Sequence, residues 1–186
     1  MRTAPTHQPS TERNQHSQRA DHETAPVEPL RGLGDVPWPD LQDSTGSAAT
    51  IPLLLNKIAW GSAPTAVTAV AELRDRICQY GFVVTQATAA TVPFLWELAQ
   101  LPHVTCRPEI VRLLGGIADA RQWERTASAY PKLLNRRENP VAWERAAREA
   151  VRERCGLLCR LPADESELGR AAAELARALD PARAAI

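Results

Sequence analysis

The four cysteines are the residues of this chain best suited to metal or redox chemistry. They are Cys78, Cys106, Cys155 and Cys159. Their spacings match no zinc knuckle, zinc ribbon or redox Cys-x-x-Cys motif. On a helix, Cys155 and Cys159 would share a face and could supply half a metal site, but partner histidines are missing. We therefore predict free thiols that are buried or partly buried and kept reduced in the cytosol, with no metal and no cofactor.

A second group of residues would suit work on nucleic acid. Trp123 stands close in sequence to Asp119, Arg121 and Arg125. An aromatic ring can stack on a base, guanidinium groups can bind phosphates, and a carboxylate can stabilise positive charge on a sugar. However, a charged segment between helices is more often a solvated connector. Acids and bases also balance at 22 each, which removes the large positive potential that phosphate binding favours.

A third group consists of side chains that commonly dominate protein interfaces, namely tryptophan and arginine. The candidates for partner contact are Trp60, Trp96, Arg112, Trp123, Arg125 and Trp143. Trp60 and Trp96 end or follow apolar stripes, so a role in covering the core competes with a role in binding. The chain contains no Walker loop, no nucleophile elbow and no His-Glu-x-x-His motif. We therefore predict a protein that is not an enzyme.

An internal repeat indicates the elements that must position these residues. The stretch Ala49-Thr50-Ile51-Pro52-Leu53-Leu54 returns 41 residues later as Ala90-Thr91-Val92-Pro93-Phe94-Leu95. Val70 and Leu73 map onto Val111 and Leu114 under the same shift. A period near ~40 residues with two helices per unit is typical of HEAT or armadillo solenoids. The competing interpretation is an ordinary helical bundle with a coincidental echo.

The first unit predicts two antiparallel helices. The cluster from Asp43 to Ser47 can cap the first helix, Pro52 fits its first turn, and Gly61 ends it. The second helix begins near Ser62 or Pro64 and runs until Gly81. The predicted buried stripes are Ile51, Leu54, Leu55 and Ile58 in the first helix and Val67, Val70, Leu73 and Ile77 in the second.

The later units repeat this plan with decreasing fidelity. In the second unit Thr91 is the expected cap, Pro93 lies in the first turn, and a partner helix starts at Pro108. The segment from Tyr130 to Leu134 stands where a third unit would begin. A long helix then opens at Pro140 and continues toward Leu157, Leu158 and Leu161. After Pro162, Asp164 is the expected cap of a final helix, and we predict an ordered loop, not strands, over residues 81–85.

The two ends of the chain differ in composition. Residues 1–36 are polar with almost no large apolar side chain, which predicts a disordered tail. Residues 37–186 are expected to form an all-α superhelix of about four helical pairs. No apolar run suits a signal peptide or a membrane span, so we expect a cytoplasmic protein. Abundant Ala and Arg suggest a GC-rich bacterial source.

A family of bacterial HEAT-repeat proteins resembles this chain in several blocks: Trp38-Pro39-Asp40-Leu41, Gly46-Ser47-Ala48, Ile51-Pro52-Leu53-Leu54 and Ala87-Thr88-Ala89-Ala90-Thr91-Val92-Pro93-Phe94-Leu95. The resemblance covers residues 38–118. Where the family often has a His-Gln-Gly-Thr-Val-Tyr type segment, this chain has Cys78-Gln79-Tyr80-Gly81-Phe82-Val83-Val84, so that histidine is absent. The family is largely uncharacterised, and the resemblance implies an α-solenoid, a binding role and an association with toxin neutralisation.

These observations favour a non-catalytic scaffold over two alternatives. In the favoured interpretation, the second helix of each pair lines a groove that holds a protein partner, as in an immunity or antitoxin protein. The first alternative is a HEAT-like DNA-binding protein, or one that resembles alkylpurine DNA glycosylases, built around Trp123. The second is an adaptor whose polar tail recruits a partner. The oligomeric state is left open.

Overall fold

The computed structural model describes residues 29–132 and 138–180, which form the predicted all-α fold. The α-helices are α1 Ile51–Trp60, α2 Ala63–Ile77, α3 Thr88–Gln100, α4 Arg107–Asp119, α5 Gln122–Ala129, α6 Pro140–Glu153 and α7 Glu167–Leu179. The 3-10 helices are η1 Leu33–Asp35, η2 Trp38–Asp40, η3 Ala48–Thr50 and η4 Cys155–Arg160. Two short antiparallel hairpins pair β1 Gln42–Asp43 with β2 Gly46–Ser47 and β3 Cys78–Gln79 with β4 Val83–Val84.

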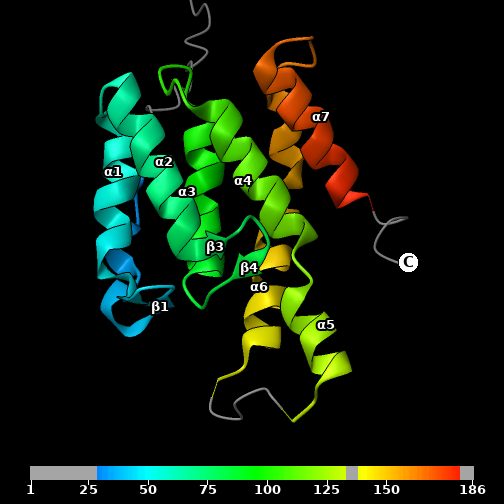
Figure 1. The fold of residues 1–186 in the computed structure, drawn as a ribbon. Coiled ribbons are helices and arrows are strands. Elements are labelled where there is room, and N and C mark those ends of the chain that lie inside the picture. Colours follow the sequence, from blue (N-terminus) through cyan, green and yellow to red (C-terminus); the bar gives the residue numbers. More distant parts are fainter. Residues whose placement is uncertain (1–28, 133–137, 181–186) are drawn as a thin grey trace, which may run out of the picture.

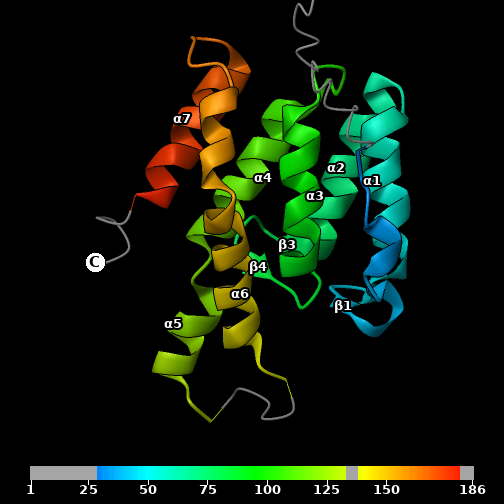
Figure 2. The same cartoon turned by 180° about the vertical axis from the view of Figure 1, so that it is seen from behind.

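The helices are arranged in two layers (Figure 1, Figure 2). One layer consists of α1, α3 and α6, and the other of α2, α4 and α7. Each layer is built from direct contacts between successive helices, and α1 also packs on α2 as α3 packs on α4. Helix α5 packs against α6 outside the two layers. Among the described residues, α1 with α2 and α3 with α4 thus form two helical pairs, while α6 packs on α3 and α4, and α7 packs on α4.

The 41-residue repeat describes the burial of the first two helical pairs well. Ile51 of α1 and Val92 of α3 are both fully buried. Leu73 of α2 and Leu114 of α4 are likewise fully buried. The shared positions therefore serve the core, because the same residue of each helix faces the other layer in both pairs.

Several predicted helix ends agree with the structure. Pro52 lies in the first turn of α1, Gly61 caps its C-terminus, and α4 carries Pro108 in its first turn. Pro140 begins α6, where the Asn139 side chain accepts a hydrogen bond from the amide of Ala142. These helix ends could be predicted because proline and capping side chains affect the backbone of residues next to them in the sequence.

The start of α3 was predicted wrongly. The helix begins at Thr88, so Pro93 lies inside it, and Thr91 bonds back to the Ala87 carbonyl instead of capping. The Thr88 hydroxyl accepts from the amide of Thr85 at 2.9 Å. It also donates to the Ile77 carbonyl at the end of α2. A contact between α2 and α3 therefore sets this helix end, and the sequence around Thr91 does not contain that information.

Residues 78–84 form a hairpin, not the predicted loop. Helix α2 ends at Ile77, before the predicted stop at Gly81, and the chain turns at once into β3. Tyr80 and Gly81 both have positive φ, at 55° and 82°. The chain therefore reverses within three residues, Tyr80, Gly81 and Phe82, which we call the hairpin tip.

The third helical unit also departs from the prediction. Helix α6 ends at Glu153, and Leu157 and Leu158 belong to the 3-10 helix η4 instead of a continued α-helix. Gly156 lowers helix propensity there, and 3-10 turns are common at helix ends. Tyr130 caps the end of α5 instead of opening a helix, and residues 133–137 lie outside the described residues. Ser166, not Asp164, caps α7.

The chain joins the core before residue 37, earlier than predicted. The predicted tail lies outside the described residues up to position 28. Leu30 is buried, and its amide donates to Oε2 of Glu97 on α3 at 3.0 Å. Trp38 is buried as well, and its indole N–H donates to the Leu33 carbonyl at 2.8 Å. The segment around η1 and η2 therefore packs against the layer that contains α1 and α3.

Candidate functional site

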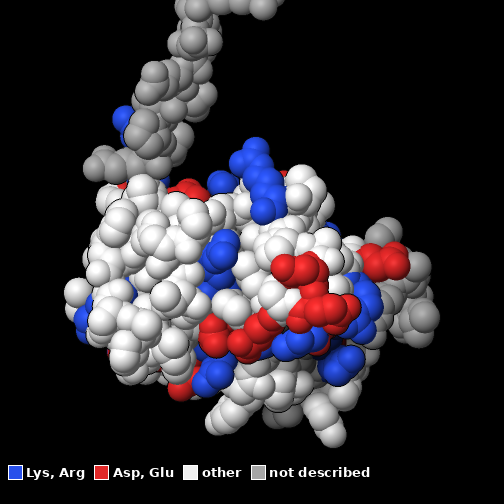
Figure 3. All heavy atoms as spheres, turned by 90° about the horizontal axis from the view of Figure 1, so that it is seen from above, with Lys and Arg blue, Asp and Glu red and all other residues white. Residues whose placement is uncertain are grey.

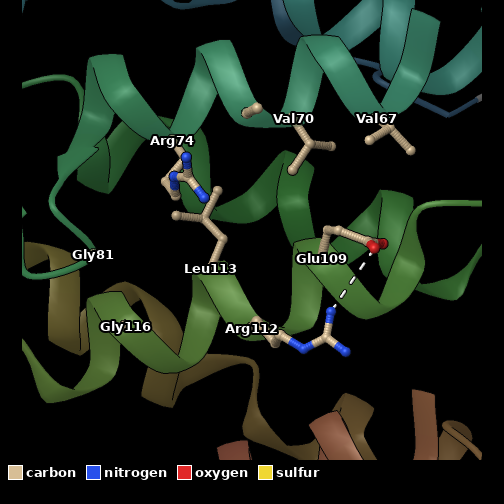
Figure 4. Close-up of a pocket in the computed structure, with 9 residues that line it drawn as sticks. Val67, Val70, Arg74, Gly81, Glu109, Arg112, Leu113 and Gly116 are labelled. Carbon is tan, nitrogen blue, oxygen red and sulfur yellow. Dashed lines mark ion pairs between the residues drawn. The ribbon is translucent and has the colours of Figure 1, made fainter. Parts of the chain in front are cut away.

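A cavity of about 320 Å³ opens between α2 and α4, the second helices of the first two pairs (Figure 4). It is lined by Val67, Val70, Ala71, Arg74, Gly81, Glu109, Arg112, Leu113 and Gly116. We call it the α2–α4 groove. Its floor is apolar and its rim is charged, as is usual for sites that bind by shape with a few orienting polar groups.

Val67 is the clearest departure from the predicted core. It belongs to the apolar stripe of α2, yet 47% of its surface is exposed. Val70, one turn further on, is buried. The stripe of α2 is therefore longer than the surface that α1 and α4 cover, and its first turns form one wall of the groove.

The hairpin tip closes one end of the groove. Gly81 lines the groove, and its carbonyl lies so close to α4 that a Cβ on Gly116 would meet it at 2.6 Å. Tyr80 has a positive φ, which a bulky residue rarely adopts. Its side chain is 81% exposed. Phe82 is also exposed, with its ring centroid 6.3 Å from that of Tyr80. Because non-glycine residues with such a backbone cluster at functional sites, the hairpin tip is a candidate functional segment.

The two charged sides of the groove differ in how far they are neutralised. Arg112 of α4 pairs with Glu109 at 3.8 Å and with Glu167 of α7. The hydrogen bond to Glu167 raises the pKa of Arg112 and lowers that of the Glu167 carboxyl. Arg74 of α2 pairs with its neighbour Asp75, with both side chains more than half exposed. Arg112 is thus held by α7, while Arg74 remains open to solvent.

Of the six residues predicted to contact a partner, Arg112 lines the α2–α4 groove. Trp60 is 60% exposed at the end of α1, where its ring stacks on His103 at 5.3 Å. The prediction for Trp96 is wrong, because this side chain is fully buried. It follows Leu95 of the core stripe directly in the sequence, and both side chains are fully buried. Trp143 is half-buried on α6, and Arg125 is exposed on α5.

Trp123 has a structural explanation that does not involve nucleic acid. Its indole N–H donates to the Val84 carbonyl at 2.9 Å, and the half-buried ring packs against the core. The guanidinium group of Arg121 donates to the carbonyls of Ala118 and Ala120. Both side chains are thus engaged by the fold.

A buried ion-pair network holds α5 to α6 beside this tryptophan. The fully buried Glu144 carboxylate accepts from the amides of Trp123 and Glu124 in the first turn of α5, at 3.0 and 2.9 Å. Arg148 donates to Glu124 at 2.7 Å and to the Ala120 carbonyl at 2.7 Å. The hydrogen bond from Arg148 lowers the pKa of Glu124. Every polar group here has a partner, so the network has a structural role.

The cysteines divide into two kinds. Cys78 and Cys106 are buried as predicted, and desolvation raises the pKa of Cys78 to about 12. Cys155 and Cys159 are exposed, which contradicts the prediction. They lie on a 3-10 helix, where residues four apart do not share a face. Within the described ranges, no group of three or more His, Cys, Asp or Glu side chains could hold a metal ion.

The residues that matter most at the groove were missed from the sequence. The sequence assigns Val67 to the core, Tyr80 to the end of the second helix and Phe82 to the loop that follows. One signal was present: an aromatic residue directly before glycine, within a short β-branched and aromatic run, is compatible with a tight hairpin. The exposure of the two rings depends on how the hairpin packs against α4, and that signal could not predict it.

Comparison with protein-family models, curated proteins and solved structures finds no match for this chain. No helix in the described part of the chain is long and apolar enough to cross a membrane. On the face seen in Figure 3, acidic and basic side chains are intermixed, and the part over α1 and α2 is largely uncharged. That face therefore offers no continuous basic surface for phosphates.

Proposed function

We propose that this chain is a non-catalytic protein-binding module of the HEAT-like α-solenoid type, and that a segment of its partner lies in the α2–α4 groove. The observation that carries the proposal is the groove itself, an apolar cavity between the second helices of two successive pairs. The second helices of such pairs form the binding surface of solenoid proteins. The exposed rings at the hairpin tip extend the same surface and belong to the residue types that dominate interfaces.

An immunity or antitoxin role is the sharper form of this proposal. It rests on the resemblance to bacterial HEAT-repeat proteins. We propose a bacterial source and a cytoplasmic location together with this role. Such proteins need tight binding to one partner and no chemistry of their own. The absence of catalytic motifs from the sequence is compatible with that role.

The test is affinity capture with a matched pair of variants. Val67→Glu places a charge in the groove at an exposed position, and Leu53→Glu places the same charge at an exposed leucine of α1, 55% exposed and outside the groove. We expect the native chain and Leu53→Glu to retain a stable protein partner and Val67→Glu to lose it. Capture of no stable partner, or equal capture by Val67→Glu, would count against the proposal.

The immunity role has a test of its own. A captured partner that is toxic when expressed alone should become harmless when the native chain is expressed with it. Growth rescue should fail with Val67→Glu, and a partner without toxicity would leave a binding module with another purpose.

A further inference from the structure

We propose that the α2–α4 groove selects an amphipathic helix whose aliphatic face is followed by a carboxylate, and that this carboxylate pairs with Arg74. The inference rests on the proposed function and names the chemistry of the partner segment. It is carried by the unequal charges at the two ends of the groove and by the apolar wall between them.

Of the two arginines that line the groove, Arg74 is the one not held by another helix. In Figure 4 its side chain lies at the end of the groove where Gly81 stands. Its side chain is 51% exposed, and its ion-pair partner is the adjacent Asp75 on the same helix, at 3.2 Å. An exposed pair between adjacent residues contributes little, so a partner's carboxylate can replace it at small cost.

Arg112 does not compete for the same carboxylate. Its guanidinium group already bonds to Glu167 and lies near Glu109. In Figure 4, Glu109 points toward Val67, at the opposite end of the groove from Arg74. Glu109, Arg112 and Glu167 together carry a net negative charge at this end, whereas the groove lining beside the hairpin tip contains the cation Arg74. This difference favours one direction for a charged occupant.

The apolar wall specifies the rest of the occupant. Val67, Val70 and Leu113 line the groove between the two charged ends. From Val67 to Arg74 is two turns of α2, or about 10 Å along the helix axis. An amphipathic helix fits this length with aliphatic side chains at i, i+3 or i+4 and i+7, followed by an acidic residue. Tyr80 and Phe82 flank Gly81, at the end of the groove where the acidic residue of the occupant would lie.

The experiment uses two synthetic 14-residue helical peptides on the full chain. Both carry the same leucine ridge. One has Lys at the start and Glu at the end of the ridge, and the other has Gln in place of this Glu. Binding is measured by fluorescence anisotropy of the labelled peptides at low and at 0.5 M salt. We expect the Glu-ended peptide to bind about tenfold more tightly, and we expect salt to reduce the difference.

Charge reversal on the protein completes the test. Arg74→Glu should abolish or invert the preference, whereas Arg154→Glu, an exposed arginine outside the groove, should preserve it. Circular dichroism confirms that both variants are folded. Equal binding of the two peptides, or an unchanged preference in Arg74→Glu, overturns the charge assignment while affinity capture still supports a binding groove. Binding of neither peptide at millimolar concentration overturns the inference of an amphipathic helix, and Val67→Glu continues to test the proposed function independently.

Discussion

The contact between the hairpin tip and α4 yields a prediction from two neighbouring glycines of one helix. A Cβ on Gly115 would meet no atom within 4 Å, whereas a Cβ on Gly116 would meet the Gly81 carbonyl oxygen at 2.6 Å. Gly115→Ala should therefore stabilise the protein by about 1 kcal/mol, the helix preference for alanine over glycine. Gly116→Ala gains the same preference, but displacing the hairpin backbone costs about 2 kcal/mol, so the net change is a loss of about 1 kcal/mol.

Thermal unfolding followed by circular dichroism measures this difference. For a chain of this length, about 1 kcal/mol corresponds to a change of about 3 °C in Tm. The Tm of Gly115→Ala should rise by about this amount and that of Gly116→Ala should fall by it. A Gly116→Ala variant as stable as Gly115→Ala would refute the close approach of the hairpin to α4. In addition, Gly116→Ala should weaken partner binding while Gly115→Ala leaves it unchanged, because Gly81 forms one end of the groove.

Three further predictions concern ionisable groups. Glu144→Ala should lower the free energy of unfolding by about 3 kcal/mol in a urea titration, since it removes a buried acceptor of two amides, whereas Glu149→Ala on the exposed face of α6 should change it little. The raised pKa of Cys78 means that the unfolded thiol ionises near pH 9 while the folded thiol does not. The free energy of unfolding should thus fall between pH 9 and about 12, and Cys78→Ala should remove this fall. In the native protein, a thiol reagent at neutral pH should modify Cys155 but spare Cys78. The lowered pKa of Glu124 acts in the other direction, because its contribution is present above pH 4.5 and is lost as the pH falls below that value. Glu124→Gln should therefore flatten the fall in Tm between pH 5 and pH 3, and an unchanged slope would contradict the ion pair.

The repeat and several helix starts and ends could be predicted from the sequence. The shift of 41 residues placed Leu73 and Leu114 in the core, and both are fully buried. Pro52, Gly61 and Pro140 marked helix ends correctly. These features depend on the period of an α-helix and on local backbone chemistry, and both act over a few residues. The local sequence is therefore enough to predict them.

Features that need two distant segments were decided by the tertiary structure. The start of α3 depends on Thr88 reaching the Ile77 carbonyl, and the position of the hairpin tip depends on the missing side chain at Gly116. The tertiary structure also buries Trp96 fully and leaves Trp60 exposed, although both follow apolar stripes in the sequence.

The candidate site illustrates the same division. The sequence by itself determined that α2 carries an apolar stripe and that aromatic residues follow it. The tertiary structure decided that α4 stands far enough from α2 to leave Val67 uncovered, and that the hairpin turns Tyr80 into solvent. An apolar side chain becomes core or binding surface according to what packs on it, and helix spacing is set by side chains of several helices at once.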